Sequence, residues 1–84
     1  MAQLRQRLEH NFNPVQLEIH DDGARHIGHV HEGSGHFSVR IVAPAFAAKR
    51  PLERHRMIYA ALGNLLQTDI HALSITALAP GEFP

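Results

Sequence analysis

The chain has 84 residues, of which eight are histidine and none is cysteine, and its eight lysine and arginine residues balance eight aspartate and glutamate residues. This length allows one domain with one modest hydrophobic core. The lack of cysteine excludes a disulfide framework, a cysteine-based zinc finger and a thiol nucleophile. The neutral charge gives no support to non-specific nucleic-acid binding.

The first expected element is a helix over residues 2–11. Leu4, Leu8 and Phe12 recur at four-residue spacing and therefore share one helix face. This charged, amphipathic start lacks the apolar core of a signal peptide, and no apolar run in the chain approaches the roughly 20 residues of a membrane span. We therefore expect a cytoplasmic protein that is not inserted in a membrane.

A first strand is predicted where Val15, Leu17 and Ile19 alternate with polar residues, because this pattern is typical of a half-buried strand. The following residues, 21–35, contain four glycines and have no hydrophobic period. They are expected to form a loop, which is long for so small a domain.

A second strand is predicted where Phe37, Val39 and Ile41 alternate with other residues, and Pro44 ends it. Two such runs on either side of a glycine-containing loop favour antiparallel neighbours.

Pro51 suits the first turn of a second helix. An apolar stripe extends this helix to about residue 67 and consists of Leu52, Ile58, Leu62, Leu65 and Leu66. Gly63 weakens the helix by about 1 kcal/mol relative to alanine, so tertiary packing has to compensate for it.

The last strand is indicated by Leu73, Ile75 and Ala77, which alternate with polar residues before a short tail at 79–84. The element order α-β-β-α-β predicts a single α+β domain over residues 1–84, with helices on one face of a three-stranded mixed sheet.

Three short motifs resemble the BolA-like family and occur in the order and spacing of that family. They are His36-Phe37 at the second strand, Arg54-His55-Arg56 early in the second helix, and Ile70-His71-Ala72-Leu73 at the third strand. The segment LEIHDD at 17–22, followed by a loop with histidines, extends the resemblance to nearly the whole chain. The resemblance implies an α-β-β-α-β fold with an added short turn or helix, similar to the type II KH domain.

The resemblance also implies a function. BolA-like proteins pair with monothiol glutaredoxins and share a [2Fe–2S] cluster in iron–sulfur trafficking or iron regulation, without being enzymes. In the shared cluster the partner supplies a cysteine and a glutathione thiolate. This chain would supply His71, plus a loop histidine that is either His26, which alignment on the acidic residues favours, or His29. Imidazole can replace thiolate on one iron of such a cluster.

The other histidines have weaker claims. His31 is a third loop candidate, and the H-x-x-H-x-H spacing of this loop can also trap zinc, nickel or copper. We interpret His36 and His55 as structural, since one opens a strand and the other lies near the start of a helix. His10 and His20 are expected to be exposed and without a role.

Two other functions have local signals in the sequence. The run from His31 to His36 has one residue too many for a zincin motif and lies in a loop rather than on a helix, which excludes a metalloprotease. Some bacterial BolA-like proteins are DNA-binding transcriptional regulators, although the G-x-x-G loop of KH domains is missing here. In this alternative Arg50, Arg54 and Arg56, at the basic start of the second helix, contact phosphates.

One departure from the family lies after Phe46, where Ala47 and Ala48 stand in place of a frequent glycine. If the turn needs a positive φ, alanine at this point costs stability.

Overall fold

The computed structural model describes residues 2–21, 36–68 and 72–82. Its elements, in chain order, are α1 (Ala2–Phe12), β1 (Gln16–Asp21), β2 (His36–Val42), the 3₁₀ helix η2 (Pro44–Phe46), α2 (Pro51–Leu62), α3 (Leu65–Thr68) and β3 (Ala72–Leu78). The described strands form one sheet in the order β1-β2-β3.

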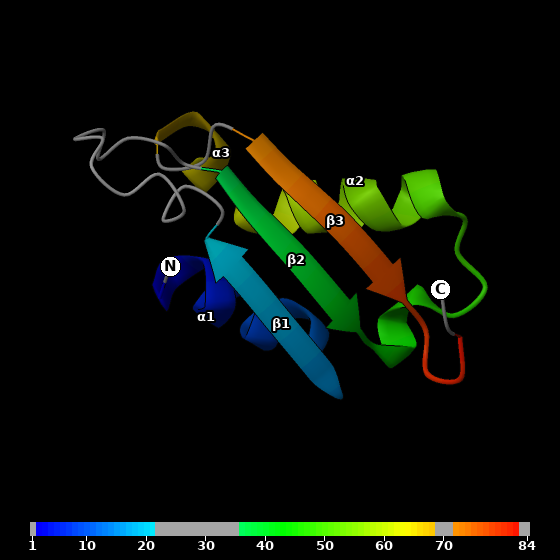
Figure 1. Ribbon diagram of the computed structural model, residues 1–84. Coiled ribbons are helices and arrows are strands. Elements are labelled where there is room, and N and C mark those ends of the chain that lie inside the picture. Colours follow the sequence, from blue (N-terminus) through cyan, green and yellow to red (C-terminus); the bar gives the residue numbers. More distant parts are fainter. Residues whose placement is uncertain (1, 22–35, 69–71, 83–84) are drawn as a thin grey trace.

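The sheet is mixed, because β1 pairs antiparallel with β2 whereas β2 pairs parallel with β3. Figure 1 shows the helices on one face of this sheet, with α1 behind β1 and α2 behind β3. The predicted α+β domain, its mixed sheet and its additional short helical turns are thereby confirmed.

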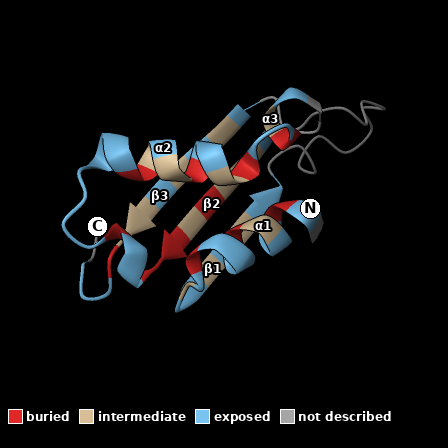
Figure 2. Cartoon of the chain, turned by 180° about the vertical axis from the view of Figure 1, so that it is seen from behind, coloured by how far each residue is buried: buried red, intermediate tan, exposed pale blue. Residues whose placement is uncertain are grey.

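The core lies between the sheet and the two long helices (Figure 2). The predicted face of α1 is buried, with Leu8 fully enclosed. From η2 comes Phe46, also fully buried, whose ring centroid lies 5.1 Å from that of Phe12. Aromatic rings at this separation contribute to stability beyond the area that they bury. The contact of Phe46 with Phe12 therefore stabilises the packing of α1 against η2 and the sheet.

The second helix is shorter than its apolar stripe predicts. It ends at Leu62 because Gly63 takes φ 55° and ψ −127°, a conformation that no helix contains, and the chain resumes as the separate turn α3. Leu52 was predicted on the buried stripe but is 62% exposed. Six residues separate it from the buried Ile58, which is not a whole number of helical turns.

Val15 is a second apolar residue that the pattern places wrongly, since it is 66% exposed and precedes the first residue of β1. Leu17 and Ile19 do pack against the core as predicted. The alternation therefore identified the strand and placed its start one residue too early.

Among the residues that the structure describes, two non-glycine residues have a left-handed backbone. Asn13, with φ 45°, ends α1 and donates its N–H to the Glu9 carbonyl, and asparagine accepts this region more readily than most residues. Ala48, with φ 62°, has no such advantage. The turn after Phe46 does need a positive φ, and this chain meets the need with alanine.

Candidate functional site

The segments that carry the predicted cluster ligands attach to the same end of the sheet. The last residue of β1 is Asp21, which pairs with Phe37, and the first residue of β2 is His36, which pairs with Ala72 at the start of β3. Residues 22–35 join Asp21 to His36, and His71 directly precedes Ala72. The parallel register therefore brings the attachment points of both candidate ligand segments together.

The candidate ligands His71, His26 and His29 themselves lie outside the described residues, as does His31. Their assignment rests on the family resemblance and on the position of their described neighbours. The loop is long enough to bring a ligand to this end of the sheet, because the five residues from Asp21 to His26 can span roughly 18 Å.

An open depression of about 290 Å³ marks this end of the sheet. Its lining consists of His36, Phe37, Ala72, Leu73 and Ser74. His36 is exposed here, whereas the sequence interpretation set it aside as structural. Only the pairing of β2 with β3 shows that this histidine lies beside the residue that follows His71, and no local pattern carries that information.

The donor chemistry fits a cluster that is completed by a partner. Within residues 2–21, 36–68 and 72–82, no three histidine, aspartate or glutamate side chains are grouped so as to hold a metal ion. The histidines attached to this sheet end supply imidazole nitrogens, and imidazole serves on one iron of a [2Fe–2S] cluster when thiolates hold the other. The chain has no thiolate of its own, so any thiolate ligand of a cluster at this sheet end would have to come from another molecule.

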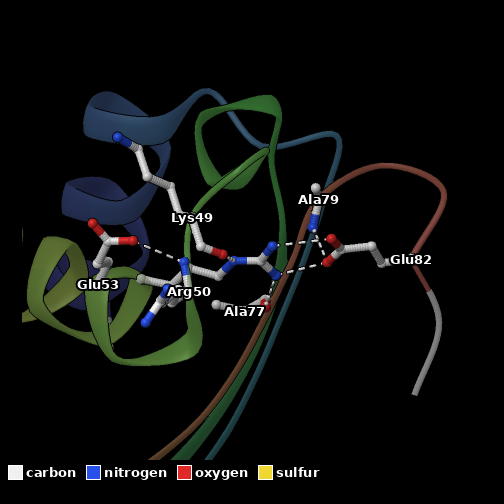
Figure 3. A network of polar contacts seen from close by, with 7 residues as sticks. Lys49, Arg50, Glu53, Ala77, Ala79 and Glu82 are labelled. Carbon is white, nitrogen blue, oxygen red and sulfur yellow. Dashed lines mark hydrogen bonds and ion pairs between the residues drawn. The ribbon is translucent and has the colours of Figure 1, made fainter.

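A second polar site lies at the other end of the sheet, around Arg54 (Figure 3). The Arg54 side chain is 10% exposed, and its Nη1 and Nη2 donate to the two carboxylate oxygens of Glu82 at 2.6 and 3.0 Å. Its Nε donates to the Lys49 carbonyl and its Nη1 also to the Ala77 carbonyl, both at 2.9 Å. One guanidinium thus joins the start of α2, the end of β3 and the turn that follows β3.

This network bears on two predictions. The Arg54 guanidinium is buried and hydrogen-bonded inside the fold, whereas Arg50 and Arg56, the other members of the predicted phosphate-contacting set, are exposed. The tail predicted at 79–84 is in part structural, because Ala79 is 5% exposed and its N–H donates to Glu82 at 2.9 Å.

The ion pair shifts the pKa of both of its members. The hydrogen bond from Arg54, followed by the one from the Ala79 N–H, lowers the pKa of Glu82 to about 2. The same hydrogen bond with Glu82 raises the pKa of Arg54 above its ordinary value, against the effect of burial. Both groups are therefore charged at neutral pH.

The remaining histidines of the described chain are not among the residues that line the depression. His10 on α1 and His20 on β1 are exposed, as the sequence indicated, and His55 on α2 is half-buried. No helix in the described part of the chain has the length and apolar character needed to cross a membrane.

A small α+β domain with a mixed sheet, helices on one face and histidine-bearing segments at one sheet end defines the class of this protein. Residues 8–82 match the family described as BolA-like protein. The chain belongs to the BolA-like family.

Solved structures agree with this membership. The chain resembles the BolA domain of SufE1 from Arabidopsis thaliana with a TM-score of 0.85 and 43% identity, covering 98% of this chain and 93% of that one. It resembles BolA1 from the same plant with a TM-score of 0.85 and 35% identity, covering 99% and 94%. These neighbours are BolA domains, and the likeness to type II KH domains stays a prediction.

Among curated relatives, the Escherichia coli protein called DNA-binding transcriptional regulator BolA is 43% identical over 77 residues, which are 86% of this chain and 71% of that protein. The chain is 41% identical to the SufE-like protein 1 of Arabidopsis thaliana over 94% of its own length, but it spans only 23% of that protein. It is 35% identical to the protein BOLA1 of the same plant over 99% of its own length and spans 55% of that protein. The names of these two plant relatives place them in the chloroplast or mitochondrion.

Proposed function

We propose that this chain is a non-enzymatic partner of a monothiol glutaredoxin and supplies histidine ligands to a shared [2Fe–2S] cluster, in iron–sulfur trafficking or iron regulation. His71 is the first ligand, and His26 or His29 is the second. The glutaredoxin brings its cysteine and a glutathione thiolate. The proposal places the protein in the cytoplasm.

The observation that carries this proposal is the common sheet end of the two ligand-bearing segments. His71 directly precedes Ala72, the first residue of a strand that pairs along its whole length with the central β2, while the loop is attached on both sides to paired strand residues. One ligand is thereby attached directly to a paired strand, and the other belongs to a segment whose two ends are attached to paired strand residues nearby. Preorganised support of this kind favours a defined metal geometry.

The site on this chain has one chemical task, which is to present neutral imidazole nitrogens to iron. Metal binding requires these imidazoles to be deprotonated, and histidine is the side chain whose protonation changes near neutral pH. Binding of the shared cluster should therefore weaken as the pH falls below the pKa of the ligating histidines. The bound cluster supplies the iron and sulfide, which are the cargo rather than part of this chain.

The proposal is tested by mixing the purified chain with a monothiol glutaredoxin, iron, sulfide and glutathione. The mixture should give visible absorption and circular dichroism spectra unlike those of the glutaredoxin alone. His71→Ala should abolish this difference, whereas His10→Ala, which changes an exposed histidine on α1, should preserve it. If His71→Ala gave the spectrum of the parent, the ligand assignment would be wrong.

The loop ligand is resolved by the same spectra. His26→Ala and His29→Ala are compared singly and together, and the ligand is the histidine whose loss alters the spectrum by itself. His36→Ala belongs in this series because His36 lines the depression next to Ala72. An unchanged spectrum in the His26→Ala, His29→Ala double variant would remove both loop candidates.

An alternative function is DNA-binding transcriptional regulation, which the name of the Escherichia coli relative favours. Its candidate phosphate contacts are Arg50, Arg54 and Arg56, of which Arg50 and Arg56 are exposed near the start of α2. It predicts a DNA affinity that falls steeply with salt concentration and is lost in the Arg50→Glu, Arg56→Glu double variant. Salt-insensitive binding, or none, would rule the alternative out.

A further inference from the structure

The outer side of α2 carries apolar side chains that the fold leaves uncovered. Leu52 and Tyr59 are two of the three large hydrophobic residues exposed in the described chain, at 62% and 41%. The buried residues of α2 are Arg54, Ile58 and Leu62, whose four-residue spacing defines the inner side of the helix. Figure 2 views the domain from the side of the helices, and exposed segments recur along α2 in this view. Leu52 and Tyr59 therefore add little to the core.

These two apolar residues share one face of the helix. Seven residues separate them, so their directions around the axis differ by only about 20° and they lie about 10.5 Å apart along it. Arg56 is four residues from Leu52 and three from Tyr59, and both are neighbouring spacings on a helix surface. We call Leu52, Arg56 and Tyr59 the outer α2 face. All three side chains are exposed, so the face consists of two apolar residues beside a cation.

The spacing of the two apolar residues matches a partner helix rather than a partner strand. A helix with a heptad repeat presents apolar side chains on one face every two turns, which is again about 10.5 Å. An extended strand presents side chains on one face about every 6.5–7 Å, which does not match the separation of Leu52 and Tyr59. Helices also pack along one another at interaxial distances of about 8–10 Å. The outer α2 face is therefore suited to a helix that lies along it.

The charges on and beside this face favour an acidic partner. The exposed charged side chains at the start of α2 are Lys49, Arg50, Glu53 and Arg56. Positive charge is in excess among them, and the nearby Arg54 and Glu82 neutralise each other in their ion pair. A helix with flanking carboxylates complements this excess, and complementary charge increases the rate and the specificity of association.

A second copy of the chain fits this face poorly. Dimers of identical chains usually have a two-fold axis, which brings the same surface of both copies together. In an antiparallel pair with Leu52 against Tyr59 of the other copy, the axis passes beside Arg56, and in a parallel pair each residue meets its own copy. Both arrangements place the two Arg56 guanidinium groups together, and juxtaposed like charges oppose association.

Duplex DNA also fits this face less well than a protein helix does. Contacts to phosphate use charged and hydrogen-bonding groups, and the alternative function above assigns them to the arginines near the start of α2. It leaves the exposed apolar area of Leu52 and Tyr59 without a partner. Tyrosine and arginine are among the residue types that most often carry binding energy at protein interfaces.

We propose that the outer α2 face binds an acidic amphipathic helix of a partner protein. Apolar side chains seven residues apart on that helix cover Leu52 and Tyr59, and carboxylates beside them pair with Arg56 and with the cations that precede α2. This binding needs neither iron nor a glutaredoxin, so the proposal does not rest on the proposed cluster ligation.

The test uses a fluorescein-labelled helical peptide with leucine at heptad positions a and d and glutamate at e and g, mixed with the intact chain without iron. Fluorescence anisotropy should show binding that weakens about tenfold or more in Leu52→Glu, because this change brings a carboxylate into the apolar contact. The matched control is Val15→Glu, since Val15 is 66% exposed but precedes β1. This variant should bind as the parent does.

A charge exchange tests the choice of an acidic partner. Arg56→Glu should weaken binding of the glutamate peptide and strengthen binding of a peptide with lysine at e and g, which the parent should bind more weakly than the glutamate peptide. Arg5→Glu changes an exposed arginine on α1 and should leave both affinities unchanged. A peptide with the composition of the glutamate peptide but with leucine at alternate positions has no apolar helix face and should not bind.

Tyr59 provides an independent readout of where the peptide binds, because the chain has one tyrosine and no tryptophan. The unlabelled glutamate peptide should reduce the quenching of Tyr59 fluorescence by acrylamide. The proposal is overturned if the lysine peptide or the alternating peptide binds the parent as tightly, if Leu52→Glu and Val15→Glu bind alike, or if no binding occurs up to about 1 mM. It is also overturned if Tyr59 is already protected in a dimer of the chain alone, or if duplex DNA rather than the peptide protects it.

Discussion

Replacing Ala48 by glycine should stabilise this domain. Ala48 has φ 62° in the turn between η2 and α2, and a left-handed backbone costs an ordinary L-residue about 1–2 kcal/mol. Glycine removes this strain but loses more conformational freedom on folding, which costs about 0.5–1 kcal/mol. The net gain for Ala48→Gly is therefore about 0.5–1 kcal/mol, or a rise in Tm of roughly 2–8 °C for a domain of this size.

The neighbouring alanine is a matched control. Ala47 is also exposed, but its φ is −61°, which any L-residue adopts without strain. Ala47→Gly should therefore lower the free energy of unfolding by about 0.5–1 kcal/mol. Neither substitution removes packing, so the two variants differ only in the backbone conformation that they meet.

Urea and thermal unfolding, followed by far-UV circular dichroism, measure both variants against the parent. The expected result is a midpoint that rises in Ala48→Gly and falls in Ala47→Gly. Equal shifts in the two variants, or a lower midpoint for Ala48→Gly, would refute the strain argument.

Three further predictions concern the fold. The Glu82 carboxyl has a pKa of about 2 in the folded protein, against an ordinary value of 4.5, so the stability that it contributes is complete above about pH 4.5 and is lost as the pH falls toward 2. The difference in urea midpoint between the parent and Glu82→Gln should therefore disappear over this pH range, and a difference that stays constant with pH would contradict the prediction. Gly63→Ala should lower the free energy of unfolding by about 1–2 kcal/mol, because Gly63 has φ 55° and a Cβ at this position would lie 3.3 Å from Arg7 Nη1. Thermal unfolding measures this loss, and an unchanged Tm would show that alanine is not strained at this helix end. Phe46→Ala should lower the free energy of unfolding by about 3–5 kcal/mol and abolish the near-UV circular dichroism signal. A folded variant with the unfolding midpoint of the parent would show that η2 does not stabilise the core.

Most of the secondary structure was predictable because it is a local property. The four-residue spacing of Leu4, Leu8 and Phe12 creates an apolar helix face wherever it occurs, and the structure buries that face. The period-two alternation in the strands works in the same way. The errors occurred at element ends, where Gly63 ended α2 early and Val15 fell before β1.

The candidate site was predictable only in part. The family resemblance selected His71, His26 and His29, and these assignments stay predictions because the residues lie outside the described chain. His36 was missed as a residue of this site, since its place beside Ala72 depends on a parallel strand pairing between residues 36 positions apart. The burial of Arg54 could not be predicted for a similar reason, as its partner Glu82 lies 28 positions further along the chain.

The sequence by itself determined the elements, their order, the family and the absence of any thiolate, because hydrophobic period and residue type act at short range. The tertiary structure alone decided which strand ends meet and which arginine is enclosed. Those outcomes depend on strand register and on the packing of α2 against β3, which arise from contacts between residues far apart in the chain.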